Sequence, residues 1–314
     1  MKTNQKIRVE PHNGINKLLI DGKEVLPLIF FFNTEVPEGF NHWEPQVKMA
    51  AGAGVHIYSF CLPWPWYVEG VEPDFSEGES FMDRFIAMDP EALFIPRIRC
   101  EPPEDWMKDH PETRVTYADG TQACMNSMAS DLWWETFEKG MTRAIQYYEN
   151  SRFGDRIIAY HPGGQNSNEW FHFDYWLKGP DTSGVNQEAF RNFLRERYGN
   201  SRNLQQAWGR DDVTLENALI PVVSAQISDP AESVDEPFMA FLDETVERNR
   251  LDFYDFTSEI TANRLVSIAE LIKRETRWQK AVLFFYGYTF EMHAAESGHF
   301  AARRLLQSEA VDML

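Results

Sequence analysis

Short apolar runs alternate with amphipathic stretches along most of the chain. The apolar runs are typical of buried parallel strands, at residues 26–32, 55–60, 92–100, 156–162 and 280–288. Between and after them, periodic apolar positions predict helices at residues 43–54, 80–88, 130–150, 186–199, 244–276 and 297–308. A sixth apolar run begins at residue 310. Strands that alternate with helices indicate βαβ units and a parallel sheet.

Local signals mark the ends of several of these elements. Residues 7–27 predict a small β-hairpin, because Asn-Gly and Asp-Gly turns separate short apolar runs. Ser130 precedes the helix at 130–150 in the position of an N-cap. The segment from residue 101 to about 126 has no clear periodicity and is predicted as a long loop.

The spacing of the strands predicts an α/β protein with the (β/α)8 TIM barrel fold. A dinucleotide-binding fold is disfavoured, since the glycine-rich stretch at residues 50–55 ends a helix and starts a strand, the reverse of the required order. A closed barrel needs eight strands, and only five with the start of a sixth are visible. We therefore expect residues 1–314 to form one partial barrel domain, the N-terminal part of a longer enzyme.

Composition and charge indicate which kinds of molecule the protein can bind. The 314 residues carry 30 basic and 49 acidic side chains, a formal net charge of -19, which disfavours nucleic acid and anionic membranes. The N-terminus has no apolar signal core and the longest apolar run has seven residues, so a cytoplasmic protein is expected. Ten tryptophans suit stacking on sugar rings. No cofactor is indicated.

No pattern of metal ligands is evident. Three widely spaced cysteines, Cys61, Cys100 and Cys124, form no CxxC pair and are expected to be buried free thiols. The stretch HAAESGH, residues 293–299, lacks the i, i+4 histidine pair of a zinc helix. We predict no metal site.

The sequence HPGGQNSNEW, residues 161–170, carries the main candidate for chemistry. Glu169 follows the fourth predicted strand, where functional residues of barrels lie. A carboxyl group among aromatic rings is harder to ionise, which suits a general acid at neutral pH. The alternative is an ordinary solvent-exposed loop glutamate.

The same stretch resembles a known family of enzymes. The Asn-Glu pair of residues 168–169 is similar to that of clan A glycoside hydrolases, and residues 190–209, with their Tyr-Gly and Ala-Trp-Gly landmarks, resemble family 42 β-galactosidases. Residues 16–28 are similar to the hairpin at the start of that family's domain. The resemblance implies a retaining glycosidase in which Glu169 is the acid/base and Asn168 contacts the sugar 2-hydroxyl.

The resemblance also implies parts that are not visible in this chain. A retaining enzyme needs a nucleophilic carboxylate about 5 Å from the acid. The family places it after strand seven, so we expect it beyond residue 314 and expect this chain to be inactive alone. Zinc-binding cysteines found in family members are not reproduced. An inverting mechanism that pairs Glu169 with Glu291 is an alternative.

Other candidates for sugar contacts lie near the predicted strand ends. His161 ends the fourth strand, Arg97 and Arg99 share one face of the third, and Tyr286 and Tyr288 share one face of the fifth. An ion pair of the arginines with Glu101 or Glu169 is an equal alternative. Tryptophans in the loops after strands two and three, including Trp66 and Trp106, could stack on a pyranose ring or pack within the loops.

A function of another class fits some of the same features. A non-catalytic carbohydrate-binding or structural half-barrel would keep the aromatic residues and arginines without an acid catalyst. In either case the expected partner is a carbohydrate. Family relatives suggest a possible homo-oligomer, although no interface is recognisable in the sequence.

Overall fold

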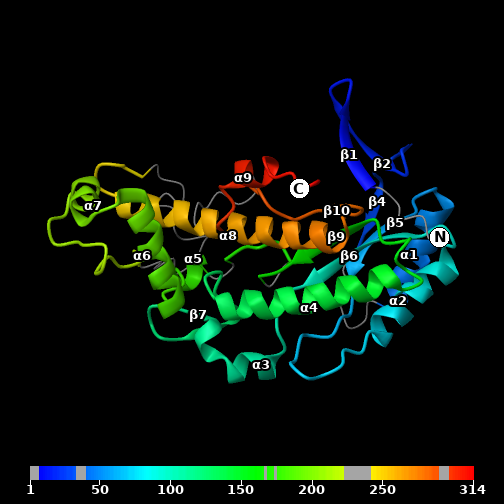
Figure 1. Cartoon of the computed structure of the whole chain (residues 1–314), viewed down its shortest axis with the longest axis horizontal. Helices are drawn as coiled ribbons and strands as arrows, with labels where there is room; N and C mark the ends of the chain where they lie inside the picture. Colours follow the sequence, from blue (N-terminus) through cyan, green and yellow to red (C-terminus); the bar gives the residue numbers. More distant parts are fainter. Residues whose placement is uncertain (1–6, 33–39, 166–167, 173–174, 223–241, 290–296) are drawn as a thin grey trace.

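The computed structural model describes residues 7–32, 40–165, 168–172, 175–222, 242–289 and 297–314. It is an α/β protein whose central element is a five-stranded parallel sheet (Figure 1). The strands are β4 (Ile29–Phe31), β5 (Ile57–Cys61), β6 (Leu93–Arg99), β9 (Ala159–Gly163) and β10 (Ala281–Val282). The five apolar runs therefore form the sheet as predicted.

The strands lie side by side in the order in which they occur in the sequence, β4-β5-β6-β9-β10. Beyond β10, Met313 bridges to Leu283 in parallel, so the sixth apolar run joins the same edge. A doubly wound fold would reverse its strand order at a switch point, whereas a barrel adds each new strand to one edge. In the described part of the chain the sheet keeps two edges and does not close.

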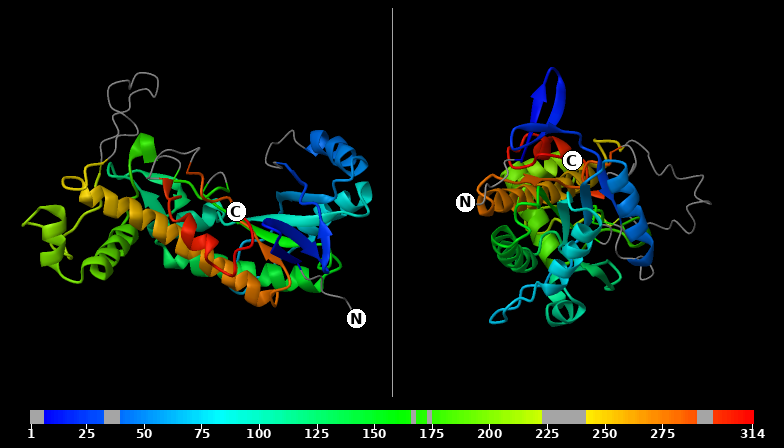
Figure 2. Two further views of the ribbon diagram at one scale, coloured as in Figure 1. Left: turned by 90° about the horizontal axis from the view of Figure 1, so that it is seen from above. Right: turned by 90° about the vertical axis from the view of Figure 1, so that its right-hand side faces the viewer.

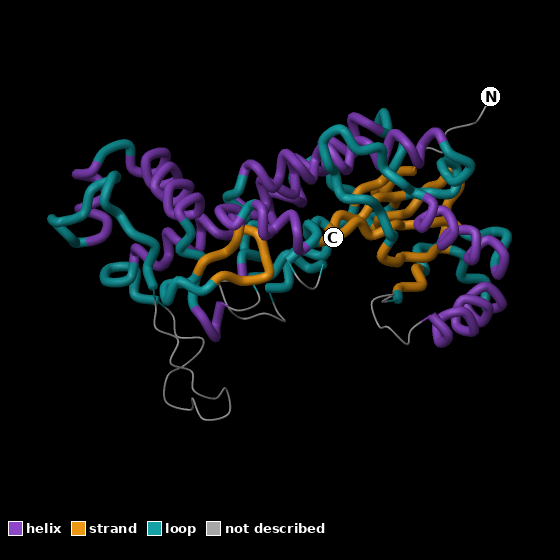
Figure 3. The backbone as a smooth tube through the Cα atoms, turned by 90° about the horizontal axis from the view of Figure 1, so that it is seen from below, coloured by secondary structure: helices purple, strands orange, loops and turns teal. Residues whose placement is uncertain are grey.

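The two faces of the sheet pack against different partners, because side chains alternate along each strand. One face carries Tyr58, Phe60 and Phe94, which are buried in the main core with residues of the surrounding helices. These helices are α1 (Phe40–Gly52), α2 (Ser76–Met88), α4 (Asp131–Asn150) and α8 (Arg248–Glu275). Figure 3 shows helices lying beside the strands. The Ser130 hydroxyl accepts from the Trp133 N–H at 3.4 Å, as expected of an N-cap.

The N-terminal segment packs against the opposite face of the sheet, near the beginning of its strands. It forms β1 (Ile7–His12), β2 (Ile15–Ile20) and β3 (Lys23–Val25), paired antiparallel. Both connecting turns, Asn13-Gly14 and Asp21-Gly22, have positive φ at both residues, which matches the right-handed twist of the strands. Buried isoleucines of β1 and β2 pack against Ile57, Ile95 and Ala159 of the sheet.

Two expectations about local structure were wrong. The segment predicted as a loop up to residue 126 contains α3 (Glu104–Asp109), a 3-10 turn at Pro111–Thr113, and an antiparallel pair of β7 (Arg114–Thr116) and β8 (Gln122–Asn126). These elements are too short to show a period in the sequence. The strand predicted over residues 280–288 extends only over Ala281–Val282, since the following residues turn toward α8 and residues 298–301.

The far end of the molecule is helical (Figures 1 and 2). It contains α5 (Tyr175–Lys178), α6 (Gly184–Tyr198) and α7 (Ser201–Trp208), and α9 (Ala302–Leu306) lies against α8. The 28-residue α8 runs beside α4 and reaches α6 and α7. None of the described helices, α8 included, combines the length and apolar character needed to cross a bilayer.

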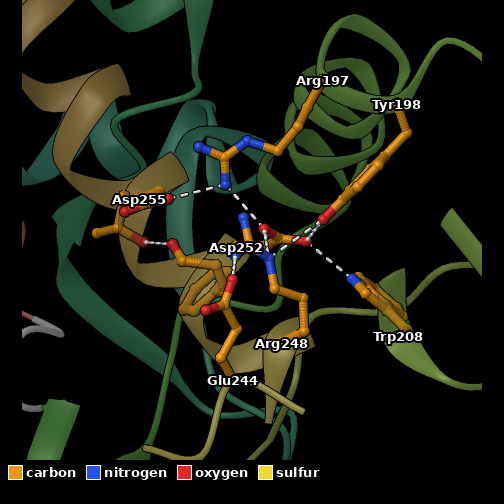
Figure 4. A network of polar contacts seen from close by, with 9 residues as sticks. Arg197, Tyr198, Trp208, Glu244, Arg248, Asp252 and Asp255 are labelled. Carbon is orange, nitrogen blue, oxygen red and sulfur yellow. Dashed lines mark hydrogen bonds and ion pairs between the residues drawn. The ribbon is translucent and has the colours of Figure 1, made fainter. Parts of the chain in front are cut away.

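A buried carboxylate joins α6, α7 and α8 (Figure 4). Asp252 of α8 is fully buried and accepts hydrogen bonds from Arg197 at 2.7 Å and from Tyr198 at 2.6 Å. It also accepts from Trp208 Nε1 at 2.8 Å and from Arg248 at 3.0 Å. Burial and the bond to Asp252 raise the pKa of Tyr198 to about 12. The Tyr-Gly and Ala-Trp-Gly landmarks of the sequence therefore supply two of the donors to one structural anchor.

The three cysteines are free thiols. Cys61 and Cys100 are buried as expected, but Cys124 in β8 is exposed. Its exposure follows from the β7–β8 pair, which was not predicted.

Candidate active site

The segment that follows β9 folds back against the end of that strand. The Trp170 N–H donates to the Gly164 carbonyl at 3.0 Å, and its indole Nε1 donates to the Pro162 carbonyl at 3.3 Å. The Trp170 ring is fully buried and stacks on Trp134 of α4, with ring centroids 5.7 Å apart. Trp170 thereby anchors the residue before it, Glu169, at the carboxyl end of the sheet.

The two glycines of this segment leave room for the fold-back. A Cβ on Gly163 would stand 2.6 Å from Cβ of Asn168. A Cβ on Gly164 would overlap Sγ of Cys100 and stand 2.8 Å from the Trp170 ring. Only residues without a side chain fit at these two positions, which explains the Gly-Gly pair in the sequence.

Backbone strain is concentrated in the same segment. Gln165, Asn168 and Trp170 adopt φ values of 60°, 66° and 64°, a region that non-glycine residues rarely visit. Each such residue costs roughly 1–3 kcal/mol, and such strain is found most often at functional sites. The surrounding contacts must compensate, and Glu169 lies between two of the strained residues.

We expect Gly164→Ala to destabilise the protein by about 1–3 kcal/mol, the usual cost of forcing extra atoms into a packed site. The new Cβ has to displace Cys100 or the Trp170 ring. Urea unfolding followed by tryptophan fluorescence measures the loss. Gly184→Ala is the matched control, because a Cβ there meets nothing within 4 Å. Equal stability of the two variants would contradict the packing argument.

The Glu169 side chain is partly buried and faces an aromatic group of residues. The Tyr288 hydroxyl donates to its Oε1 at 3.3 Å. The Tyr288 ring lies 5.2 Å from Phe171 and 5.6 Å from the buried ring of His299. Phe171 and His299 were not singled out as site residues from the sequence, and only the position of Phe171 two residues after Glu169 gave a signal.

Tyr286 and Tyr288 meet the site in different ways. The expectation that they share the face of a strand was wrong, because β10 ends at Val282. Tyr286 is buried, donates to the Gly298 carbonyl at 2.9 Å and stacks on His299 at 4.6 Å. Tyr288 reaches Glu169 instead. The structure thus brings Tyr288 to the carboxylate and places Tyr286 behind His299.

Arg97 and His161 lie next to each other on the inner face of the sheet, in register across β6 and β9. Arg97 donates to the Phe32 carbonyl at 2.5 Å, and its guanidinium lies 4.1 Å from the centre of the Phe31 ring. The His161 ring is 0% exposed and meets Phe285 edge-on at 4.4 Å. Burial, together with the charge of Arg97, lowers the pKa of His161 to about 3.

The low pKa of His161 predicts an acid-sensitive fold. Between a pH of about 6.5 and 3 the unfolded chain binds a proton at this residue and the native state does not. The free energy of unfolding should therefore fall as pH falls, by about 1.4 kcal/mol per pH unit from this group. Urea unfolding at pH 7, 6 and 5 measures this change. The free energy of unfolding should depend less steeply on pH in His161→Leu than in the unaltered chain. The same pH dependence in both proteins would contradict this role of His161.

The remaining predicted contacts are Arg99 and the two tryptophans Trp66 and Trp106. Arg99 forms an ion pair with Glu101 at 3.2 Å, one of the two roles expected for it. Trp66 and Trp106 pack edge-on to each other at 5.7 Å, in one cluster with Trp64 and Phe137. Trp106 belongs to α3 rather than to a loop. The ring contacts of Trp66 and Trp106 join them to this cluster and, for Trp106, to His110.

Some of the candidate residues lie outside the described part of the chain. Glu291, proposed as the partner of an inverting mechanism, is one of them, and so are His293 and Glu296. Among the residues that are described, no three histidine, cysteine or acidic side chains come together as a metal site would require. An open groove of about 790 Å³ between α8 and α9 contains none of the predicted site residues.

Solved structures with a similar fold include β-galactosidases and a β-amylase. The chain is similar to the β-galactosidase of the psychrophilic Marinomonas ef1, with a TM-score of 0.60 and 16% identity over 82% of this chain. It is also similar to Gan42B, a GH42 β-galactosidase from G. stearothermophilus (0.54, 14%, 81% of this chain), and to the β-amylase catalytic domain of Paenibacillus polymyxa (0.62, 11%, 90%). No family model and no curated protein matches the sequence.

At these identities the similarity establishes the fold. The chain spans 37% of the length of the Marinomonas enzyme, 34% of Gan42B and 75% of the β-amylase domain. The parallel sheet, its helices and the strand order thus match glycosidases of the TIM-barrel type.

Proposed function

We propose that this protein is a retaining glycoside hydrolase of the β-galactosidase type, with Glu169 as its acid/base. The observation that carries the proposal is the position of Glu169: a partly buried carboxyl group just after β9, held by a strained segment and contacted by the Tyr288 hydroxyl. In barrel enzymes catalytic groups lie at this end of the strands. The similarity to β-galactosidases of the same fold supports the assignment.

The proposed reaction uses Glu169 twice. Its protonated carboxyl group gives a proton to the glycosidic oxygen as the bond to the leaving group breaks. The resulting carboxylate then takes a proton from the water that releases the sugar. The Tyr288 hydroxyl, which donates to Oε1, can fix the orientation of this carboxyl oxygen.

A second carboxylate completes the proposal. A retaining enzyme holds it about 5 Å from the acid, on the other side of the sugar. The sheet of the described residues reaches β10 and the Met313 bridge. By resemblance to the family the nucleophile follows strand seven, so we propose that it comes from sequence outside these 314 residues.

Recognition of the sugar is proposed for residues around Glu169. Asn168, the immediate neighbour, is the proposed contact to the 2-hydroxyl group. Tyr288, in the segment after β10, and Arg99, at the end of β6, are further candidates, since β6 and β10 both pair with β9. Arg97 and His161, the other predicted sugar contacts, are buried at paired positions of β6 and β9.

Hydrolysis of nitrophenyl β-galactoside by the complete gene product and by the 314-residue chain tests the proposal. We expect activity in the complete product with the β-anomer of galactose formed first, as NMR can follow. Initial release of the α-anomer would favour an inverting mechanism with Glu291. Sugar binding by calorimetry without hydrolysis in either protein would favour the non-catalytic alternative.

A further inference from the structure

His299 lies at the centre of the contacts behind Glu169. Its ring is fully buried between Phe171, with centroids 4.2 Å apart, and Tyr286, at 4.6 Å, and is nearly parallel to both. Phe171 belongs to the segment after β9 and Tyr286 to the segment after β10. His299 therefore joins the two stretches of chain that bring Glu169 and Tyr288 together.

The hydrogen bonds of His299 determine which of its nitrogens carries the proton. Nδ1 accepts from the backbone N–H groups of Gly287 at 3.0 Å and Tyr288 at 3.4 Å. A nitrogen that accepts cannot carry a hydrogen, so the neutral ring is protonated on Nε2. Burial lowers the pKa of His299 to about 4, although the nearby backbone of Trp170 and Glu169 acts in the opposite direction. The ring is therefore neutral at pH 7.

A second set of hydrogen bonds fixes the His299 segment itself. The Tyr286 hydroxyl donates to the Gly298 carbonyl at 2.9 Å and accepts from the Ala301 N–H at 3.3 Å. Tyr286 thus binds the backbone of Gly298 and Ala301, on either side of His299. His299 in turn binds the backbone of Gly287 and Tyr288, which follow Tyr286. The orientation of Tyr288 depends on this reciprocal arrangement, because its own backbone N–H is one of the donors.

We infer that His299 is a positioning residue: its Nδ1 fixes the backbone of residues 287–288 and so holds the Tyr288 hydroxyl against Glu169. The inference rests on the proposed function, in which Glu169 is the acid/base. His299 makes its hydrogen bonds to the backbone of residues 287 and 288. It acts through Tyr288, and its effect should disappear when Tyr288 no longer reaches Glu169.

Two substitutions of His299 distinguish the role of its Nδ1 acceptor from that of its aromatic ring. His299→Phe keeps an aromatic ring between Phe171 and Tyr286 but removes the acceptor. His299→Asn loses the ring but offers its Oδ1 at the position of Nδ1. We expect hydrogen exchange of the Gly287 and Tyr288 amides to become about tenfold faster in His299→Phe, because partly buried N–H groups lose their partner. In His299→Asn the protection should be largely retained.

The link to Glu169 can be measured without any turnover. In protein labelled at the Cζ carbons of tyrosine, the Tyr288 resonance should respond to Glu169→Gln. We expect this response to be lost in the His299→Phe background and restored with His299→Asn. The Tyr160 resonance is the control, since its hydroxyl bonds to Glu149 at 2.9 Å, away from this site, and should not change.

These measurements separate the inference from the proposed function. Unchanged amide exchange in His299→Phe, or a Tyr288 response to Glu169→Gln that persists in that background, would overturn the positioning role. A complete gene product that hydrolyses no glycoside would count against the proposed function only. The exchange and resonance results would still show whether His299 holds Tyr288 in place.

Discussion

Replacing Glu169 with glutamine should lower kcat of the complete gene product on an alkyl β-galactoside by about 10²–10⁴-fold, the usual contribution of a positioned general acid/base. Glutamine has nearly the same shape, and its carbonyl oxygen can still accept from Tyr288, whose hydroxyl lies 3.3 Å from Glu169 Oε1. The fold should therefore survive. What is lost is the proton that the leaving group requires.

The pattern across substrates distinguishes loss of the acid from general damage. A dinitrophenolate leaving group needs no proton. Its release in the first step, when the glycosyl-enzyme forms, should therefore be far less impaired by Glu169→Gln. The second step lacks its base, and added azide, which needs none, should restore turnover and yield a glycosyl azide. Glu216→Gln is a matched control at an exposed position. Equal losses on both substrates, or none on either, would rule out the proposed role.

The extent of agreement between sequence and structure has a physical explanation. A buried strand must be apolar on both faces, and a helix must repeat its apolar positions, so the parallel strands and long helices were visible as patterns. Ser130 was recognised because a cap needs only local geometry. β7 and β8 were missed, since each has at most five residues and is stabilised by tertiary contacts, such as the bond from the Thr116 N–H to Asp181.

The candidate site was only partly predictable for the same reason. Glu169 could be located from its place after a strand. The positive φ of Asn168 and Trp170 depends on contacts with residues far away in sequence. His299 meets Tyr288 only because Gly287 turns the chain after β10, with φ of 92°. Such encounters leave no periodic signal.

The largest effect on stability is expected at Asp252, at the opposite end of α8 from the sheet. Asp252→Ala would leave the guanidinium groups of Arg197 and Arg248 without their buried partner, and the Tyr198 hydroxyl and Trp208 N–H without an acceptor. Removal of one partner from a buried ion pair costs about 3–5 kcal/mol, because the remaining charge stays desolvated. The free energy of unfolding from urea titration should fall by that amount.

Asp255 provides a matched comparison on the same arginine. It contacts Arg197 at 2.8 Å, but its side chain is 52% exposed and has water as an alternative partner. Asp255→Ala should therefore cost less than about 1 kcal/mol. If the two variants proved equally stable, burial would not be the source of the effect. If Asp252→Ala alone unfolds the α6–α7 region, then Tyr198 and Trp208, the residues that made the sequence resemble β-galactosidases, are there for folding and not for catalysis.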